Sequence, residues 1–173
     1  MTDSKRPHLR PARPEDAAEI VAMVRELALF EREPLSSVEV TEADIRRDCF
    51  GPNPRAEVLI LEEEGAVLGF ALFFHNYSTW LGRAGIYLED FYLRPHARGR
   101  GLGRMVLAGL AQIARQRGCR RLELQVLDWN PARGFYERIG MVHRDDWCSY
   151  RLSGEALTRL ASEVDDGSWL ERP

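Results

Sequence analysis

The stretch Ile86-Tyr87-Leu88-Glu89-Asp90-Phe91-Tyr92-Leu93 leads directly into Arg94-Pro95-His96-Ala97-Arg98-Gly99-Arg100-Gly101-Leu102-Gly103. The first part predicts a strand, and the apolar spacing after Gly103 predicts a helix that ends at Gly118. Glycines at alternate positions remove side chains, so consecutive backbone N–H groups can converge on phosphate oxygens beside the positive end of the helix dipole. Because residues 94–104 also hold four arginines, the stretch predicts a phosphate-binding turn between a strand and a helix.

Two common nucleotide-binding motifs do not fit this turn. A Walker A loop requires G-x-x-x-x-G-K-[ST], whereas the only lysine of the chain is Lys5. A dinucleotide-binding turn has the spacing G-x-G-x-x-G, whereas this turn has G-x-G-x-G and lies in the middle of the chain. We therefore expect another kind of phosphate ligand.

Strands and helices mix along the rest of the chain. Strands are expected at residues 8–11, 56–61, 67–77, 122–126 and 147–152. Helices are expected from Pro14 to about Glu31, from the Thr41-x-x-Asp44 capping box to Gly51, from the Asn130-Pro131 N-cap to Gly140, and after Ser153. One early hairpin and later strand-helix-strand crossovers predict a mixed α/β sheet. With 173 residues we expect a single domain over 1–173, with its core at about 8–161 and a loosely held tail at about 164–173.

The cysteine, histidine and apolar patterns argue against several classes of protein. Three widely spaced cysteines without C-x-x-C predict neither a disulfide framework nor a zinc site, and the four histidines show no ligand spacing, so we expect no metal. No apolar run approaches the ~20 residues of a spanning helix. No apolar run follows the charged N-terminal residues either, so we expect no secretory signal, no membrane association and a cytoplasmic protein.

Charge is distributed unevenly. Residues 94–121 contain eight arginines and no acid, so this segment carries +8 and the remainder −11 within a net charge of −3. The basic segment is suited to an anion and the remainder to a cation. Nucleic acid is the weaker alternative because the whole chain is acidic, with a pI near 5.9.

Five motifs carry a resemblance to a known family. They are Tyr77-Ser78-Thr79-Trp80, Tyr87-Leu88-Glu89-Asp90-Phe91, Arg98-x-x-Gly101-x-Gly103, Leu127-Asp128-Trp129-Asn130 and Phe135-Tyr136. The third resembles the pyrophosphate-binding motif of the GNAT superfamily of acetyl-CoA-dependent N-acetyltransferases. Together the five resemble the diamine (spermidine/spermine) acetyltransferase family, in particular its thialysine-preferring branch, over about Leu9 to Ala161.

The resemblance implies a fold, a co-substrate and an assembly. It implies the GNAT fold, with a central, mostly antiparallel sheet flanked by helices, and a homodimer. It implies acetyl-CoA as co-substrate, bound by Phe91, Leu93, Arg98, Gly99, Arg100, Gly101, Leu102, Gly103, Arg104, Asn130 and Tyr136.

Acetyl transfer to an amine needs an unprotonated nucleophile, stabilisation of the oxyanion and a proton for the departing thiolate. An alkylammonium with a pKa near ~10.4 is only about 0.1% free amine at pH 7.4, so a base is required. The resemblance implies that Glu89 is this base, acting through water, that Tyr136 is the acid, and that backbone N–H near Leu93 holds the oxyanion. From the residues alone, strand alternation sends Glu89 and Asp90 to opposite faces. Both carboxylates could also leave a splayed strand end for solvent or arginine, and Tyr136 could be a core residue of an amphipathic helix.

The resemblance also implies substrate contacts. It assigns them to Glu89, Asp90, Trp80, Asp145 and Trp147. Ser78-Thr79 stands where the polyamine-preferring branch has Asp-Pro, which favours a small primary amine, such as a thialysine-like amino acid or a short diamine, over long polyamines. Two alternatives remain: a protein or peptide N-acetyltransferase, and an acyl-CoA-binding module without catalysis, against which the presence of Glu89 and Tyr136 speaks.

Overall fold

The structure is a computed structural model that describes residues 6–164. The chain divides into two units, one ending at Phe135 and one beginning at Tyr136. The tail expected at about 164–173 lies outside the described residues except for Val164.

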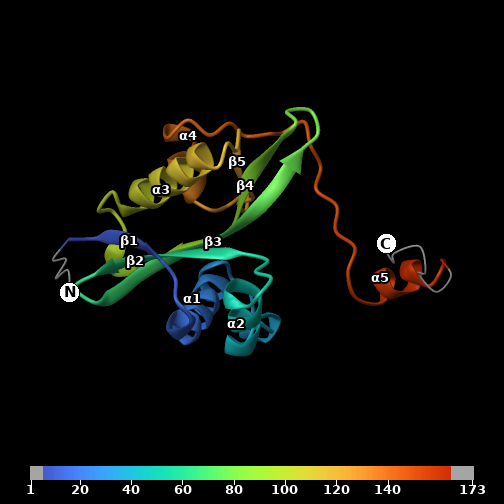
Figure 1. Ribbon diagram of the computed structural model, residues 1–173, viewed down its shortest axis with the longest axis horizontal. Helices are drawn as coiled ribbons and strands as arrows, with labels where there is room; N and C mark the ends of the chain where they lie inside the picture. The colour runs from blue at the N-terminus through green and yellow to red at the C-terminus, as the bar shows by residue number, and fades with distance from the viewer. Residues whose placement is uncertain (1–5, 165–173) are drawn as a thin grey trace. The chain divides into compact units, whose positions relative to one another are not determined.

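A five-stranded sheet forms the centre of the first unit (Figure 1). Its strands are β1 (His8–Pro11), β2 (Glu57–Glu63), β3 (Ala66–Ser78), β4 (Arg83–Leu93) and β5 (Leu122–Leu124). They lie in sequence order; β1 to β4 are antiparallel to their neighbours, and β5 runs parallel to β4. The predicted mixed, mostly antiparallel sheet is therefore confirmed. Glu64 and Gly65, with φ of 51° and 79°, form the tight turn of the predicted hairpin between β2 and β3.

Helices cover both faces of the sheet. They are α1 (Ala17–Phe30), which follows a short 3-10 turn at Pro14–Asp16, α2 (Glu42–Phe50) and α3 (Leu102–Gln116). Figure 1 shows α1 and α2 against one face and α3 against the other. The fully buried side chains of Ile20, Met23, Ile60 and Phe70 form a core between α1 and the sheet. This packing fixes the end of α1 next to β4, where the site is expected.

The capping box predicted for the second helix is present. The backbone N–H of Asp44 donates to Thr41 Oγ1 at 3.2 Å, and the backbone N–H of Thr41 donates to Asp44 Oδ2 at 3.0 Å. Two donors that the helix itself cannot satisfy are thus paired locally. The helix ends where Gly51 was expected to stop it.

Two irregularities in β4 shape the site. Phe73 of β3 pairs with Leu88, and Leu72 pairs with Asp90, so Glu89 is the extra residue of a β-bulge. The parallel pairing with β5 stops at Leu88. The bulge interrupts the regular alternation expected for Glu89 and Asp90. In the described chain, the remainder of β4 up to Leu93 has no neighbouring strand on its β5 side, so its backbone groups there remain open to a ligand.

Several element bounds differ from expectation. β4 begins at Arg83 rather than at residue 86, because the long hairpin extends its pairing with β3 to Ser78. β5 ends at Leu124 rather than at residue 126, because its pairing with β4 stops at Leu88, directly before the bulge. The helix α4 (Ala132–Arg138) spans the boundary of the two units and is shorter than the range from Asn130 to Gly140.

The second unit corrects one prediction outright. Within the described residues, 147–152 form no strand, because none of the strand pairings of the sheet includes this segment. The last helix, α5 (Gly154–Ala161), is present with Ser153 at its N-cap position. The Ser153 side chain makes no capping hydrogen bond, so only the position of this cap was predicted correctly.

Candidate active site

The turn between β4 and α3 has the backbone of an anion site. Gly99 and Gly101 have φ of 73° and 76°, and a Cβ added to either would meet no atom within 4 Å. Glycine is therefore required by the left-handed backbone rather than by packing. Within residues 6–164, the N–H groups of residues 99–103 have no backbone acceptor. Successive unpaired donors at the N-terminus of a 15-residue helix are an arrangement that can bind phosphate oxygens.

The underside of this turn is packed. A Cβ on Gly103 would lie 3.4 Å from Phe135 Cζ, 3.7 Å from Phe91 Cζ and 3.8 Å from Leu93 Cδ1. Leu102 is buried beside them. Three of the residues expected to bind acetyl-CoA, namely Phe91, Leu93 and Gly103, are thus brought together, and a Cβ at Gly103 would make ordinary van der Waals contacts with the two side chains.

The four arginines of the turn have different surroundings. Arg94 forms ion pairs with Glu19 and Glu26 of α1, and Arg100 forms one with Glu63. Arg98 donates from Nε to the backbone oxygen of Leu93 at 2.9 Å. Arg104 is exposed and has no side-chain partner in the described chain. Among the four arginines of the turn, Arg104 is therefore the one whose guanidinium pairs with no other group of the described chain and can interact with a ligand.

Two adjacent carboxylates lie at the bulge of β4. Glu89 is exposed, whereas Asp90 is partly buried. Burial, with the nearby charges of Glu89 and Glu31, raises the pKa of Asp90 to about 6. Asp90 therefore remains ionised at neutral pH at a cost, which a bound cation would reduce. The bulge and the edge beyond it place these acids directly before the anion turn along one strand.

Comparison with known proteins identifies the family. The profile of the acetyltransferase (GNAT) family matches residues 21–141. The chain belongs to the GNAT acetyltransferase family. Its members use acetyl-CoA as co-substrate, so the turn and the edge of β4 are the expected place for that molecule. The resemblance in the motifs is thereby confirmed.

Relatives of this GNAT acetyltransferase are similar over nearly the whole chain. Thialysine N-epsilon-acetyltransferase of Mus musculus is 39% identical over 166 residues, covering 88% of this chain and 96% of the relative. The protein of the same name in Caenorhabditis elegans is 36% identical over 154 residues, covering 87% and 94%. Among solved structures, an integron cassette protein from the mobile metagenome of V. cholerae has a TM-score of 0.75 at 25% identity, covering 90% of this chain and 97% of that one.

Asn130 has the capping role that its sequence context predicts. Its side chain is buried, with 8% exposed, and Oδ1 accepts a hydrogen bond from the backbone N–H of Ala132 at 2.9 Å. It thereby satisfies a donor at the start of α4. The contact of Asn130 with acetyl-CoA stays a prediction.

Of the remaining predicted site residues, Trp80 lies at the other end of β4 from the carboxylates, and Asp145, Trp147 and Tyr136 belong to the second unit. Trp80 is 90% exposed at the β3–β4 turn, and β4 carries the chain about 20 Å from Arg83 to Glu89. Asp145 and Trp147 are exposed in the second unit, next to an ion pair of Arg144 with Asp146 at 3.0 Å. Their roles stay predictions.

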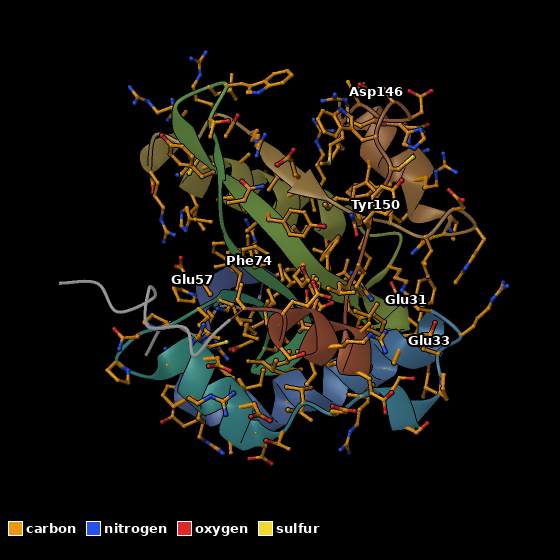
Figure 2. All side chains as sticks on the ribbon, turned by 90° about the vertical axis from the view of Figure 1, so that its right-hand side faces the viewer. Glu31, Glu33, Glu57, Phe74, Asp146 and Tyr150 are labelled. Atoms are coloured by element: carbon orange, nitrogen blue, oxygen red, sulfur yellow. The ribbon has the colours of Figure 1, made fainter. Side chains whose placement is uncertain are left out.

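The sequence analysis missed two acids at the end of α1. Glu31 and Glu33 lie on the segment that follows α1 (Figure 2). Burial and the charge of Glu33 raise the pKa of Glu31, and the charge of Glu31 in turn raises the pKa of Asp90. The signal that could have found them is the pattern acid–arginine–acid directly after an amphipathic helix. Only the fold brings this pattern beside β4.

Residues 6–164 contain neither a metal-binding cluster nor a membrane-spanning helix. That part of the chain contains no group of three or more His, Cys, Asp or Glu side chains able to hold a metal ion. None of its helices has the length and apolar character needed to cross a bilayer.

Proposed function

We propose that this enzyme transfers the acetyl group of acetyl-CoA to a primary amine of a small, cationic molecule, either a thialysine-like amino acid or a short diamine. The observation that carries this proposal is the position of Asp90, a partly buried carboxylate with Glu89 and Glu31 nearby, directly before an anion turn on the same strand. An acidic environment attracts an alkylammonium, and the turn attracts a diphosphate. The relatives named for thialysine acetylation support the same class of acceptor.

Acetyl-CoA supplies the activated acetyl group, and the residues of the chain bind and orient it. The N–H groups of residues 99–103, with the charge of Arg104, bind the diphosphate. Phe91 and Leu93 pack under the turn, and the open edge of β4 offers backbone donors and acceptors along its length. A backbone N–H near Leu93 holds the developing negative charge on the carbonyl oxygen.

Two side chains move the protons. Glu89, exposed at the bulge, accepts a proton from the ammonium group of the substrate through water, which frees the amine lone pair for attack. Tyr136 gives its phenolic proton to the sulfur that leaves. Asp90, Glu31 and Glu33 attract and hold the cationic substrate. The nitrogen loses two protons in all: the first leaves the ammonium through water and Glu89 and is released to solvent, and the second leaves as the C–N bond forms and the C–S bond breaks. The sulfur gains one proton from Tyr136, and the second proton restores the phenol, so the reaction releases one net proton.

An amine panel tests the proposed function. Purified enzyme with acetyl-CoA is given thialysine, lysine, putrescine, spermidine and a lysine-containing peptide, and the release of free thiol is followed. We expect the highest kcat/KM for thialysine or the short diamine. Turnover confined to the peptide would replace the proposal by a protein acetyltransferase, and binding of acetyl-CoA without any turnover would replace it by a binding module.

A change at Gly101 tests the anion turn. Gly101→Ala places a Cβ where φ is 76°, at a cost of about 1–2 kcal/mol in folding free energy, and the backbone relaxes away from the geometry that aligns the N–H groups. We expect the KM for acetyl-CoA to rise about tenfold. The control is Gly118→Ala at the other end of α3, where φ is 68° and a Cβ also meets no atom within 4 Å. Equal effects of both variants on KM would exclude an anion role for the turn.

We further propose that the enzyme is a homodimer, as the resemblance implies, and that it is cytoplasmic and binds no metal, as the residue patterns indicate. Light scattering tests the assembly. A mass twice that of the 19.8 kDa chain supports a dimer, and a mass of one chain at assay concentration contradicts it.

A further inference from the structure

Four side chains from three segments form a continuous stack in the first unit. The guanidinium of Arg98 lies 4.6 Å from the ring centre of Phe30, at the end of α1. The ring of Phe30 lies 6.2 Å from that of Trp129, in the β5–α4 loop, at an angle of 51°. The guanidinium of Arg32 lies 4.1 Å from the ring centre of Trp129. The stack thus links the anion turn, the segment after α1 and the loop that caps α4.

Arg32 occupies a backbone position that favours glycine. Its φ is 66°, its N–H donates to Leu29 O at 3.2 Å, and the N–H of Glu33 donates to Ala28 O at 2.9 Å. This is the left-handed residue that ends a helix, for which glycine is the usual choice. An arginine here adds backbone strain. Its side chain contacts the ring of Trp129.

The segment held by this contact carries like charges. Arg32 separates Glu31 from Glu33, and the charge of Glu31 also acts on Asp90. Mutual repulsion of these carboxylates favours movement of the segment away from β4. Stacking of Arg32 on a half-exposed tryptophan opposes that movement, because the contact is lost if the segment moves outward.

The other end of the stack is fixed to the site. Arg98 is held by Leu93 O at the end of β4, and Trp129 directly precedes the buried cap Asn130. The rings of Phe30 and Trp129 are therefore held by two fixed groups, the guanidinium of Arg98 and the backbone next to Asn130. A segment anchored to them takes a defined distance from β4.

We propose that Arg32 and Trp129 are positioning residues, which hold the acidic segment Glu31–Glu33 beside Asp90 and so set the affinity of the enzyme for its cationic amine. This inference rests on the proposed function. According to this proposal, Arg32 lowers the KM for the amine, although its positive charge alone would raise that KM. A nearby positive charge repels an ammonium substrate, so its removal without loss of positioning would lower the KM for the amine.

The test is Arg32→Gly, measured with thialysine and acetyl-CoA. Glycine suits a φ of 66°, so the variant should unfold at the same temperature as the wild type or higher. We expect the KM for thialysine to rise about tenfold, with kcat within about threefold and the KM for acetyl-CoA within about twofold. Arg32→Lys, which keeps the charge and part of the stacking, should recover part of the loss. Trp129→Phe should keep more affinity than Trp129→Ala.

The matched control is Glu64→Gly in the β2–β3 turn, where φ is 51°. It relieves the same kind of backbone strain without touching the stack, so its KM for thialysine should equal that of the wild type. An unchanged or lower KM in Arg32→Gly overturns the inference and leaves the proposed function intact. A wild-type enzyme that acetylates no amine of the panel overturns the proposed function, and the inference with it.

Discussion

Tyr136→Phe is expected to lower kcat by a factor of about 10²–10⁴, which is the usual contribution of a positioned general acid. The substitution removes one hydroxyl group and keeps the ring, so packing around α4 is preserved. Without the phenolic proton, the sulfur must leave as a free thiolate or take its proton from water. The KM for acetyl-CoA should change little, since the hydroxyl acts on the departing group. Single-turnover kinetics with acetyl-CoA and thialysine measure the chemical step directly.

The matched control for Tyr136 is Tyr150→Phe. It makes the same chemical change in the same unit, at a side chain that is 93% exposed. We expect wild-type kinetics from it. If Tyr136→Phe also retains wild-type turnover, Tyr136 is a structural residue and the proton for the thiolate comes from another group.

Local signals predicted the parts of the fold that depend on short stretches of chain. The capping box at Thr41 and the N-cap at Asn130 are satisfied by hydrogen bonds to residues two or three positions away. The glycine spacing of the anion turn reflects positive φ at Gly99 and Gly101. In each of these cases, all the residues that determine the feature lie within a few positions of one another in the sequence.

Features that depend on distant partners were not predictable in this way. The bulge at Glu89 depends on the register of β3 against β4, which no spacing within β4 reveals. The alternation in residues 147–152 predicted a strand, but a strand also needs a neighbour. The contacts of Arg98 with Phe30 and of Arg100 with Glu63 join residues that only tertiary structure brings together.

Asp90→Asn should make the protein more stable and the enzyme less active. The pKa of Asp90 is raised from an ordinary 3.8 to about 6. The folded state therefore binds the proton more tightly than the unfolded state, and the ionised group costs stability that appears as the pH rises through this window. Above pH 6 the asparagine should add at most ~3 kcal/mol to the free energy of unfolding, and below about pH 4 it should add nothing. Urea unfolding at pH 7.5 and at pH 3.5 measures both limits.

The same substitution removes a charge from the amine site. We expect the KM for thialysine to rise by a factor of about 10–100, because a carboxylate of limited solvent exposure interacts strongly with an ammonium group. In the wild type, the KM for thialysine should rise as the pH falls below about 6, where Asp90 takes up its proton. Asp90→Asn should lack this pH dependence.

Glu89→Gln is the matched change on the neighbouring residue, and it separates binding from proton transfer. Glu89 is exposed, so the substitution should leave the free energy of unfolding nearly unchanged. Because Glu89 is the base, its loss should lower kcat by a factor of about 10²–10⁴ and raise the KM for thialysine much less than Asp90→Asn does. Two adjacent carboxylates on one strand would then differ in role because the bulge leaves one in solvent while the fold partly buries the other. Equal effects of both variants on kcat, KM and stability would contradict this division.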